Sequence, residues 1–149
     1  MAKIAKNKID GIDFNFHVWG INSPLVDYRL CWLLNNILEW NFERVNDIEI
    51  DSEKDNSIIY FNAYKYENKE DFYTVEIIQN KNDGFVLLPE LRNIDYLLLF
   101  DGEEDYFDKD EITTVFKQIQ GIQSIFEIEV DNLKSKYKLL MRHFNDTKQ

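Results

Sequence analysis

The chain has 149 residues, of which 44% are hydrophobic and 15% aromatic, and it carries a formal net charge of −11. This composition excludes the disordered class of proteins, in which low hydrophobicity accompanies high net charge, and the length fits one domain with its own core. Residues 9–130 hold 26 acidic but only 9 basic side chains, so we expect no nucleic-acid partner, because phosphates would be repelled.

The first predicted elements are a strand and a helix. Apolar and polar side chains alternate over residues 12–20, as they do in a strand. Ser23 and Pro24 then predict a helix start, with Ser23 as the N-cap and Pro24 in the first turn. The apolar residues that follow have helical spacing and predict one core-facing side, formed by Val26, Leu30, Leu33, Leu34, Ile37 and Leu38.

The middle of the chain reads as an antiparallel meander. Three alternating segments, residues 42–50, 57–66 and 72–79, are rich in Ile, Phe, Tyr and Val and are joined by short polar connections. The tripeptide Asn82-Asp83-Gly84 supplies residues that tolerate the positive φ of a tight turn. Pro89 has no N–H to donate to a sheet, so it predicts the end of a strand and a turn or one helical turn after it.

The last third of the chain predicts further strands and helices. Residues 94–100 are apolar on both faces, which is typical of a central strand. Asp108 caps a second amphipathic helix that ends near Gly121. A half-buried strand follows over residues 124–130, and helical spacing resumes from Leu133.

The predicted elements give a fold class. We expect an α+β protein with a mostly antiparallel sheet of five to seven strands and two or three helices packed on one face. Residues 1–149 should form a single domain, with residues 1–9 and 145–149 flexible.

One motif stands out around Pro89. Leu88-Pro89-Glu90, three further residues and then Ile94-Asp95-Tyr96 resemble the pattern that names an uncharacterised bacterial family, the IPExxxVDY proteins. Four residues match the pattern: Pro89, Glu90, Asp95 and Tyr96. Leu88 and Ile94 stand in place of its Ile and Val, and residues 27–35 also resemble the N-terminal helix of that family. The resemblance implies no activity, cofactor or catalytic residue.

The polar residues of this motif allow two interpretations. Glu90, Arg92 and Asp95 lie close together around a turn and could form the acid-base site of a hydrolase or a transferase. They could instead support the turn, with Pro89 and Tyr96, through hydrogen bonds to buried backbone groups. We expect the structural role, because no serine, cysteine or histidine nucleophile accompanies them.

No other pattern predicts a cofactor or a metal. His17, His143 and Cys31 are far apart in the sequence and lack the spacing of a metal site. The acidic stretch that begins at Asp101 fails the EF-hand pattern, because Tyr106 stands where glycine is required. The five glycines are scattered, so no phosphate-binding loop can be drawn from them.

The first helix carries a candidate binding surface. Tyr28, Trp32 and Asn35 lie about half a turn from the predicted apolar side, with Arg29 beside them. Tyrosine and tryptophan are enriched at protein interfaces. The alternative is that another segment, such as the basic C-terminal one, covers these aromatics.

These observations favour a binding protein over an enzyme. We expect a small structural or binding module that binds a protein partner or itself. We expect it in the cytoplasm, because the start of the chain lacks a secretory signal. We expect no membrane segment, because no apolar run is long enough to span a bilayer. One alternative is an acidic chaperone-like domain that holds a basic or amphipathic client segment. The other is the enzyme with a site around Glu90, Arg92 and Asp95. Whether a small molecule also binds is not determined by the sequence.

Overall fold

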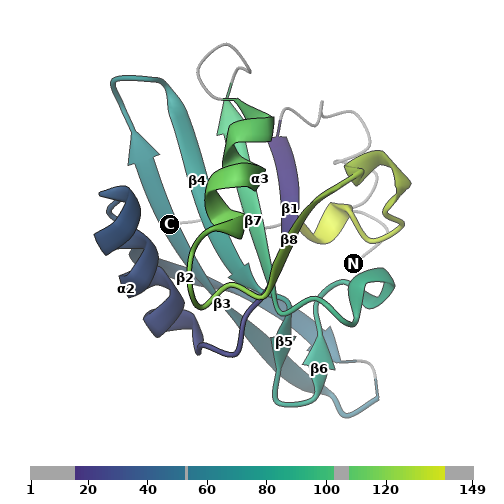
Figure 1. The fold of residues 1–149 in the computed structure, drawn as a ribbon. Coiled ribbons are helices and arrows are strands. Elements are labelled where there is room, and N and C mark those ends of the chain that lie inside the picture. The colour runs from purple at the N-terminus through teal and green to yellow at the C-terminus, as the bar shows by residue number, and fades with distance from the viewer. Residues whose placement is uncertain (1–15, 53, 103–107, 140–149) are drawn as a thin grey trace.

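The computed structural model describes residues 16–52, 54–102 and 108–139. The elements in chain order are β1 (Phe16–Asn22), α2 (Asp27–Leu38), β2 (Glu43–Ser52), β3 (Ser57–Asn68), β4 (Tyr73–Gln79), β5 (Lys81–Asn82), β6 (Phe85–Val86), the 3-10 helix η1 (Pro89–Leu91), β7 (Tyr96–Gly102), α3 (Lys109–Lys117), β8 (Ser124–Ile128) and the 3-10 helix η3 (Val130–Asn132). Six strands form an antiparallel sheet in the order β2-β3-β4-β7-β1-β8 (Figure 1). The predicted α+β class with an antiparallel sheet is confirmed.

Local sequence features explain the meander, the β5-β6 turn and the buried strand β7. β2, β3 and β4 form the predicted meander, with a bulge in β2 between Val45 and Ile48. Asp83 and Gly84 both have positive φ in the turn that joins β5 to β6, as the tight turn requires. β7 lies between β4 and β1, and its residues 96–100 are all buried, which is why this strand is apolar on both faces.

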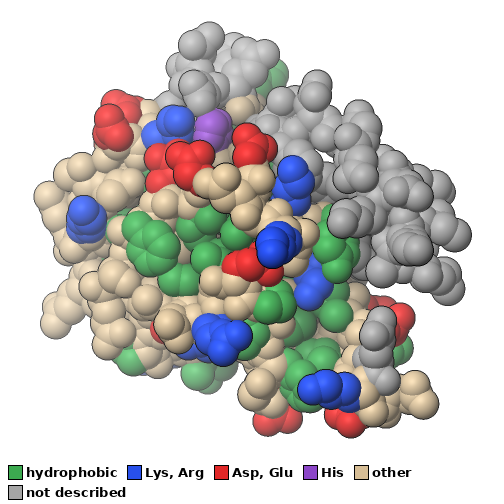
Figure 2. Space-filling model, turned by 90° about the vertical axis from the view of Figure 1, so that its right-hand side faces the viewer, with side chains coloured by type: hydrophobic (Ala, Val, Ile, Leu, Met, Phe, Trp, Pro, Cys, Tyr) green, Lys and Arg blue, Asp and Glu red, His purple; other side chains and the backbone are tan. Residues whose placement is uncertain are grey.

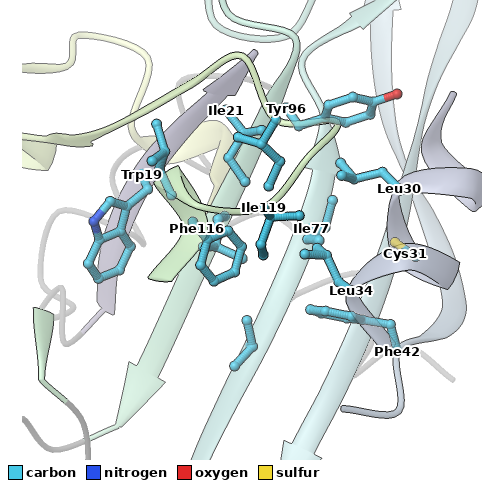
Figure 3. Close-up of a cluster of buried hydrophobic side chains, with 14 of the residues drawn as sticks. Trp19, Ile21, Leu30, Cys31, Leu34, Phe42, Ile77, Tyr96, Phe116 and Ile119 are labelled. Carbon is cyan, nitrogen blue, oxygen red and sulfur yellow. The ribbon is translucent and has the colours of Figure 1, made fainter. Parts of the chain in front are cut away.

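Both α-helices pack on one face of the sheet. The side chains between helices and sheet, called here the helix-side core, include Trp19, Leu30, Leu34, Phe42, Ile77, Tyr96, Phe100, Phe116 and Ile119 (Figure 3). Trp19 lies edge-on to Phe100, with ring centroids 5.4 Å apart, and its Nε1 donates a hydrogen bond to Thr113 Oγ1 of α3 at 3.0 Å. The buried indole therefore satisfies its N–H while it anchors α3. Asp108 is the N-cap of α3, as predicted, and accepts hydrogen bonds from the N–H groups of Asp110 and Glu111.

The predicted start of the first helix is wrong. α2 begins at Asp27, and its N-cap residue is Val26, which makes no side-chain capping bond. The Ser23 hydroxyl donates instead to Gly121 O at 2.6 Å and accepts from Leu25 N–H. Ser23 therefore ties the loop before α2 to the segment after α3.

The predicted core-facing side of this helix is wrong in part. Leu30 and Leu34 are buried as expected, but Val26 is 50% exposed and Ile37 is 49% exposed. The buried stripe instead includes Asp27, whose Oδ2 accepts from Asn62 Nδ2 at 2.7 Å and from the Tyr64 hydroxyl at 2.8 Å. These two bonds turn Asp27 toward the sheet, and this orientation moves Val26 and Ile37 outward.

The opposite face of the sheet has its own core. This far-side core includes Phe16, Val18, Ile48, Phe61, Ile78, Leu87, Leu88, Ile94, Leu97, Leu99, Ile128, Leu133 and Leu139. It is covered by two non-strand segments, the motif turn around η1 and the chain that follows β8. Fully buried leucines such as Leu88 contribute about 2 kcal/mol each by leaving water.

The C-terminal predictions need correction. The strand predicted over residues 124–130 ends at Ile128, Val130 opens η3, and Phe126 is 42% exposed because β8 is an edge strand. The helix predicted from Leu133 starts later, since Leu133 is extended and only residues 137–139 are helical at the end of the described chain. Residues 12–15 of the first predicted strand lie outside the described residues, as do residues 1–9 and 145–149, which the sequence predicts to be flexible.

We predict that Asp27→Ala lowers the free energy of unfolding by roughly 2 to 3 kcal/mol, because it leaves the buried Tyr64 hydroxyl and the Asn62 amide without their acceptor. Urea denaturation of the purified variant measures the loss. Asp131→Ala, which removes an exposed carboxylate in η3, should stay within about 0.5 kcal/mol of the native protein. Equal effects of the two substitutions would contradict the role given to Asp27.

Candidate functional site

The motif around Pro89 is built on a buried asparagine outside it. Asn80 follows β4 and is fully buried. Its Nδ2 donates to Leu91 O at 2.7 Å and to Ile94 O at 2.9 Å, and its Oδ1 accepts from Leu88 N at 3.0 Å. Its backbone bonds to Leu87 and Asp95 as well. One side chain thus fixes both ends of the turn that contains η1.

Glu90 connects this turn to the C-terminal segment. Its carboxylate accepts from Ser135 N at 3.1 Å and from the Ser135 hydroxyl at 2.8 and 3.0 Å. Partial burial acts to raise the pKa of Glu90, but the bonds from Ser135 and the charge of Lys138 outweigh it, and the pKa lies below its ordinary value. Lys138 Nζ donates to Leu87 O at 3.0 Å, and desolvation lowers the pKa of this lysine.

Asp95 connects the same turn to the loop before α2. Its Oδ2 accepts from Ser23 N at 3.0 Å, and its Oδ1 lies 3.1 Å from Lys81 Nζ. Asp95 N donates to Asn22 Oδ1 at 3.0 Å. The hydroxyl of Tyr96 donates to Leu25 O in that loop, and burial raises the pKa of Tyr96. Asp95 and Tyr96 therefore both hold the loop before α2, whereas Glu90 holds the C-terminal segment.

The structure does not gather the motif into one reactive group. Glu90 bonds to Ser135, and Asp95 bonds to Ser23 and Lys81. Arg92 is exposed and makes no hydrogen bond or ion pair with the described residues. The arrangement supports the structural interpretation of Pro89, Glu90, Asp95 and Tyr96.

The remaining candidates for chemistry are also dispersed. In the part of the chain that the structure describes, no three His, Cys, Asp or Glu side chains form a group that could hold a metal ion. Cys31 lies on the buried side of α2, and desolvation together with the nearby Asp27 raises the pKa of its thiol, which keeps it protonated. Residues 103–107 of the acidic stretch lie outside the described residues.

The outward side of α2 is the second candidate. Tyr28 is 64% exposed and Trp32 is 62% exposed, and Arg29 between them is exposed without a hydrogen bond or ion pair to the described residues. Asn35 uses its side chain within the protein, because its Oδ1 accepts a hydrogen bond from Phe42 N at 2.8 Å and its Nδ2 donates one to Phe42 O at 3.3 Å. Asn35 therefore closes the loop after α2.

Figure 2 allows the outward side of α2 to be compared with another part of the surface. It shows the side of the molecule turned away from α2, which lies on the left in Figure 1. Hydrophobic side chains appear there in small groups that are separated by acidic and basic side chains. Small apolar groups of this kind are ordinary on a soluble surface.

Sequence reasoning missed Asn80 and Ser135, the two partners that fix the motif. Asn80 carries the one available signal, a polar residue placed directly after the apolar strand β4 and before the turn. Ser135 lies 45 positions from Glu90, and nothing in its neighbourhood predicts that contact.

Comparison with family models, with curated proteins and with solved structures finds no match to this chain. Within the described residues, no helix combines the length and the apolar character that crossing a bilayer requires.

We predict that Asn80→Ala destabilises the protein by roughly 2 to 4 kcal/mol, because the buried Leu88 N–H loses its acceptor and two carbonyls lose a donor. Denaturant midpoints measure this change. Asn36→Ala is the matched control, since Asn36 is exposed and bonds only within its own helix. A midpoint for Asn80→Ala close to that of the control would show that the turn forms without this amide.

We also predict a pH-dependent contribution of Glu90. A carboxyl group whose pKa is lowered by folding stabilises the native state above its unfolded pKa, and this stabilisation is lost as the pH falls through the lowered folded pKa. The stability difference between the native protein and Glu90→Gln should therefore be present at neutral pH and disappear as the pH falls below about 4.3.

Urea denaturation at a series of pH values provides the measurement. Glu129→Gln, at an exposed position whose carboxylate accepts no hydrogen bond from the described residues, is the control and should show little pH-dependent difference. A constant Glu90→Gln difference across the series would mean that the contact with Ser135 does not depend on the charge.

Proposed function

We propose that the protein is a small non-enzymatic binding module that associates with a second copy of itself through the outward side of α2. The observation that carries the proposal is the exposure of Tyr28 (64%) and Trp32 (62%) on one stable helix. The opposite side of the helix is fixed to the sheet by Leu30, Leu34 and the bonds of Asp27. The aromatics are thus held outward on a rigid support, an arrangement that suits an interface.

The charges on this side of α2 favour a second copy as the partner. Arg29 lies near the start of the helix, and Glu39 follows its last turn. Both are exposed, and neither has an ion pair with the described residues. If two copies of α2 pack antiparallel about a two-fold axis, Arg29 of one copy faces Glu39 of the other, twice over. Such self-complementarity is the requirement of an isologous dimer.

Two further expectations from the sequence, the cytoplasmic location and the family resemblance, are proposals as well. We place the module in the cytoplasm, supported by the single cysteine and the composition of the chain. We also keep the resemblance to IPExxxVDY proteins as a proposal, supported by the pattern from Leu88 to Tyr96. The hydrolase or transferase reading loses support, because Glu90 and Asp95 are both engaged in bonds that hold the fold together.

We predict that Trp32→Ala weakens self-association by roughly 30-fold, about 2 kcal/mol, with a nearly unchanged melting temperature, because the side chain is 62% exposed in the monomer. Sedimentation equilibrium and a thermal melt on the same sample measure both quantities. Phe85→Ala removes another exposed aromatic, on β6, and should leave association unchanged.

The charge arrangement is tested by reversal. Arg29→Glu and Glu39→Arg should each weaken the dimer, and the double variant should restore it, because the pair is rebuilt with opposite signs. A native protein that sediments as a monomer at all concentrations would overturn the proposed self-association. A dimer that persists in both single variants and in Trp32→Ala would place the interface elsewhere.

A further inference from the structure

The ribbon formed by β2 and β3 extends beyond the rest of the sheet. β3 pairs with β2 back to Ser57, whereas it pairs with β4 only from Ala63 onward. Residues 49–60, with residue 53 outside the described chain, therefore form a free end that lies beside the β5-β6 hairpin (Figure 1). We call the described part of this segment the ribbon end.

One side chain from the end of β4 and one from the neighbouring hairpin hold β3 at and next to the ribbon end. Gln79 Oε1 accepts from Asn62 N at 2.9 Å, and Asn82 Nδ2 donates to Tyr60 O. On the other side of the ribbon, Ile59 and Ile50 pack against the far-side core. The exposed side of this segment is therefore presented on a supported strand pair.

The exposed side carries two large apolar side chains. Ile58 is 48% exposed and Tyr60 is 45% exposed. They alternate with Ile59 and Phe61 of the far-side core, and so they point to the same side of the sheet as Tyr64, which lies under α2. α2 begins at Asp27, which bonds to Asn62, and the helix runs away from Ile58 and Tyr60 without covering them.

Two carboxylates flank these apolar side chains. Asp51 is the cross-strand partner of Ile58, and Glu49 is the partner of Tyr60. Both are exposed, and neither forms an ion pair with the described residues. Arg44 farther along the ribbon cannot neutralise them, because it bonds to Asp47 Oδ1 and to Asn62 Oδ1, each at 2.6 Å. The formal charges of Lys54 and Asp55 in the connecting turn sum to zero.

We propose that the ribbon end docks a basic amphipathic segment of a partner protein. Ile58 and Tyr60 would receive the apolar side of that segment, and Glu49 and Asp51 would pair with its lysine or arginine side chains. Charge complementarity decides the class of partner, since an acidic segment would be repelled by these two carboxylates and by the strongly acidic body of the protein. A second copy of the ribbon end would bring the same carboxylates together. The site is separate from the outward side of α2 and does not depend on self-association.

The test uses a fluorescent amphipathic helical peptide made of leucine and lysine, titrated with the full-length protein and followed by fluorescence anisotropy. We expect saturable binding that weakens at high salt, and no binding of the same peptide with glutamate in place of lysine. Ile58→Ser combined with Tyr60→Ser should weaken binding by roughly tenfold or more, through loss of the apolar contact. Glu49→Lys combined with Asp51→Lys should weaken it similarly, by charge reversal alone.

Matched controls locate the effect. Phe126→Ser removes a comparably exposed apolar side chain at the other edge of the sheet, and Glu67→Lys combined with Glu70→Lys makes the same charge change at the opposite end of β3. Both controls should bind the peptide like the native protein. Trp32→Ala should also bind it normally, which separates this proposal from the dimer.

Several outcomes would overturn the proposal. Absence of binding to the lysine peptide is one, and equal losses in the ribbon-end and control variants are another. Equal affinity for the glutamate peptide would refute the role of Glu49 and Asp51. A changed molar mass of the Ile58→Ser, Tyr60→Ser variant, with unchanged peptide binding, would assign the ribbon end to contacts between copies of the chain instead.

Discussion

The amide of Asn80 is the interaction on which the motif turn depends. A fully buried amide is costly unless its donors and acceptor are all used, and the side chain of Asn80 uses them on Leu88, Leu91 and Ile94. With the turn fixed, Glu90 reaches the C-terminal segment and Asp95 reaches the loop before α2. The fixed turn thus places side chains that contact distant parts of the chain. Acidic side chains that resemble a catalytic pair in the sequence serve here as acceptors for buried backbone N–H groups.

A second buried polar group determines what the molecule presents to its surroundings. The carboxylate of Asp27 bonds to Asn62 and Tyr64, and these bonds set the rotation of α2 about its axis. The helix then presents Tyr28 and Trp32 to solvent, together with Val26 and Ile37. These bonds act together with the buried Leu30 and Leu34 to decide which side of the helix faces the solvent. Any change at Asp27 that rotates the helix would alter the surface that it presents.

The sequence predicts the meander and its turns well because the evidence for them is local, but it does not determine the order of all six strands. The meander over β2, β3 and β4, the turn at Gly84 and the cap at Asp108 each depend on a few neighbouring residues, and the structure confirms them. The errors come from long-range contacts. Apolar periodicity alone cannot place Asp27 in the buried stripe, because its partners lie on β3. In the same way Ser23 resembles a helix cap, and only the position of Gly121 shows why its hydroxyl turns elsewhere. The candidate site shows the same limit. Helical spacing places Tyr28 and Trp32 away from the predicted apolar side, but only the structure shows that they are exposed, and nothing near Ser135 predicts its bond to Glu90.

The distribution of carboxylates gives the acidity of the chain more than one physical role. Asp27 is buried, whereas Glu90 and Asp95 keep contact with solvent, and hydrogen-bond donors of the fold engage all three carboxylates. Glu49 and Asp51 stand on a free ribbon end, next to apolar side chains that neither core covers. An edge strand rich in acidic residues resists pairing with another copy of itself, and at the proposed docking site the same charges would select against acidic partners. Specificity at such a surface arises from repulsion of the wrong segment as much as from attraction of the right one.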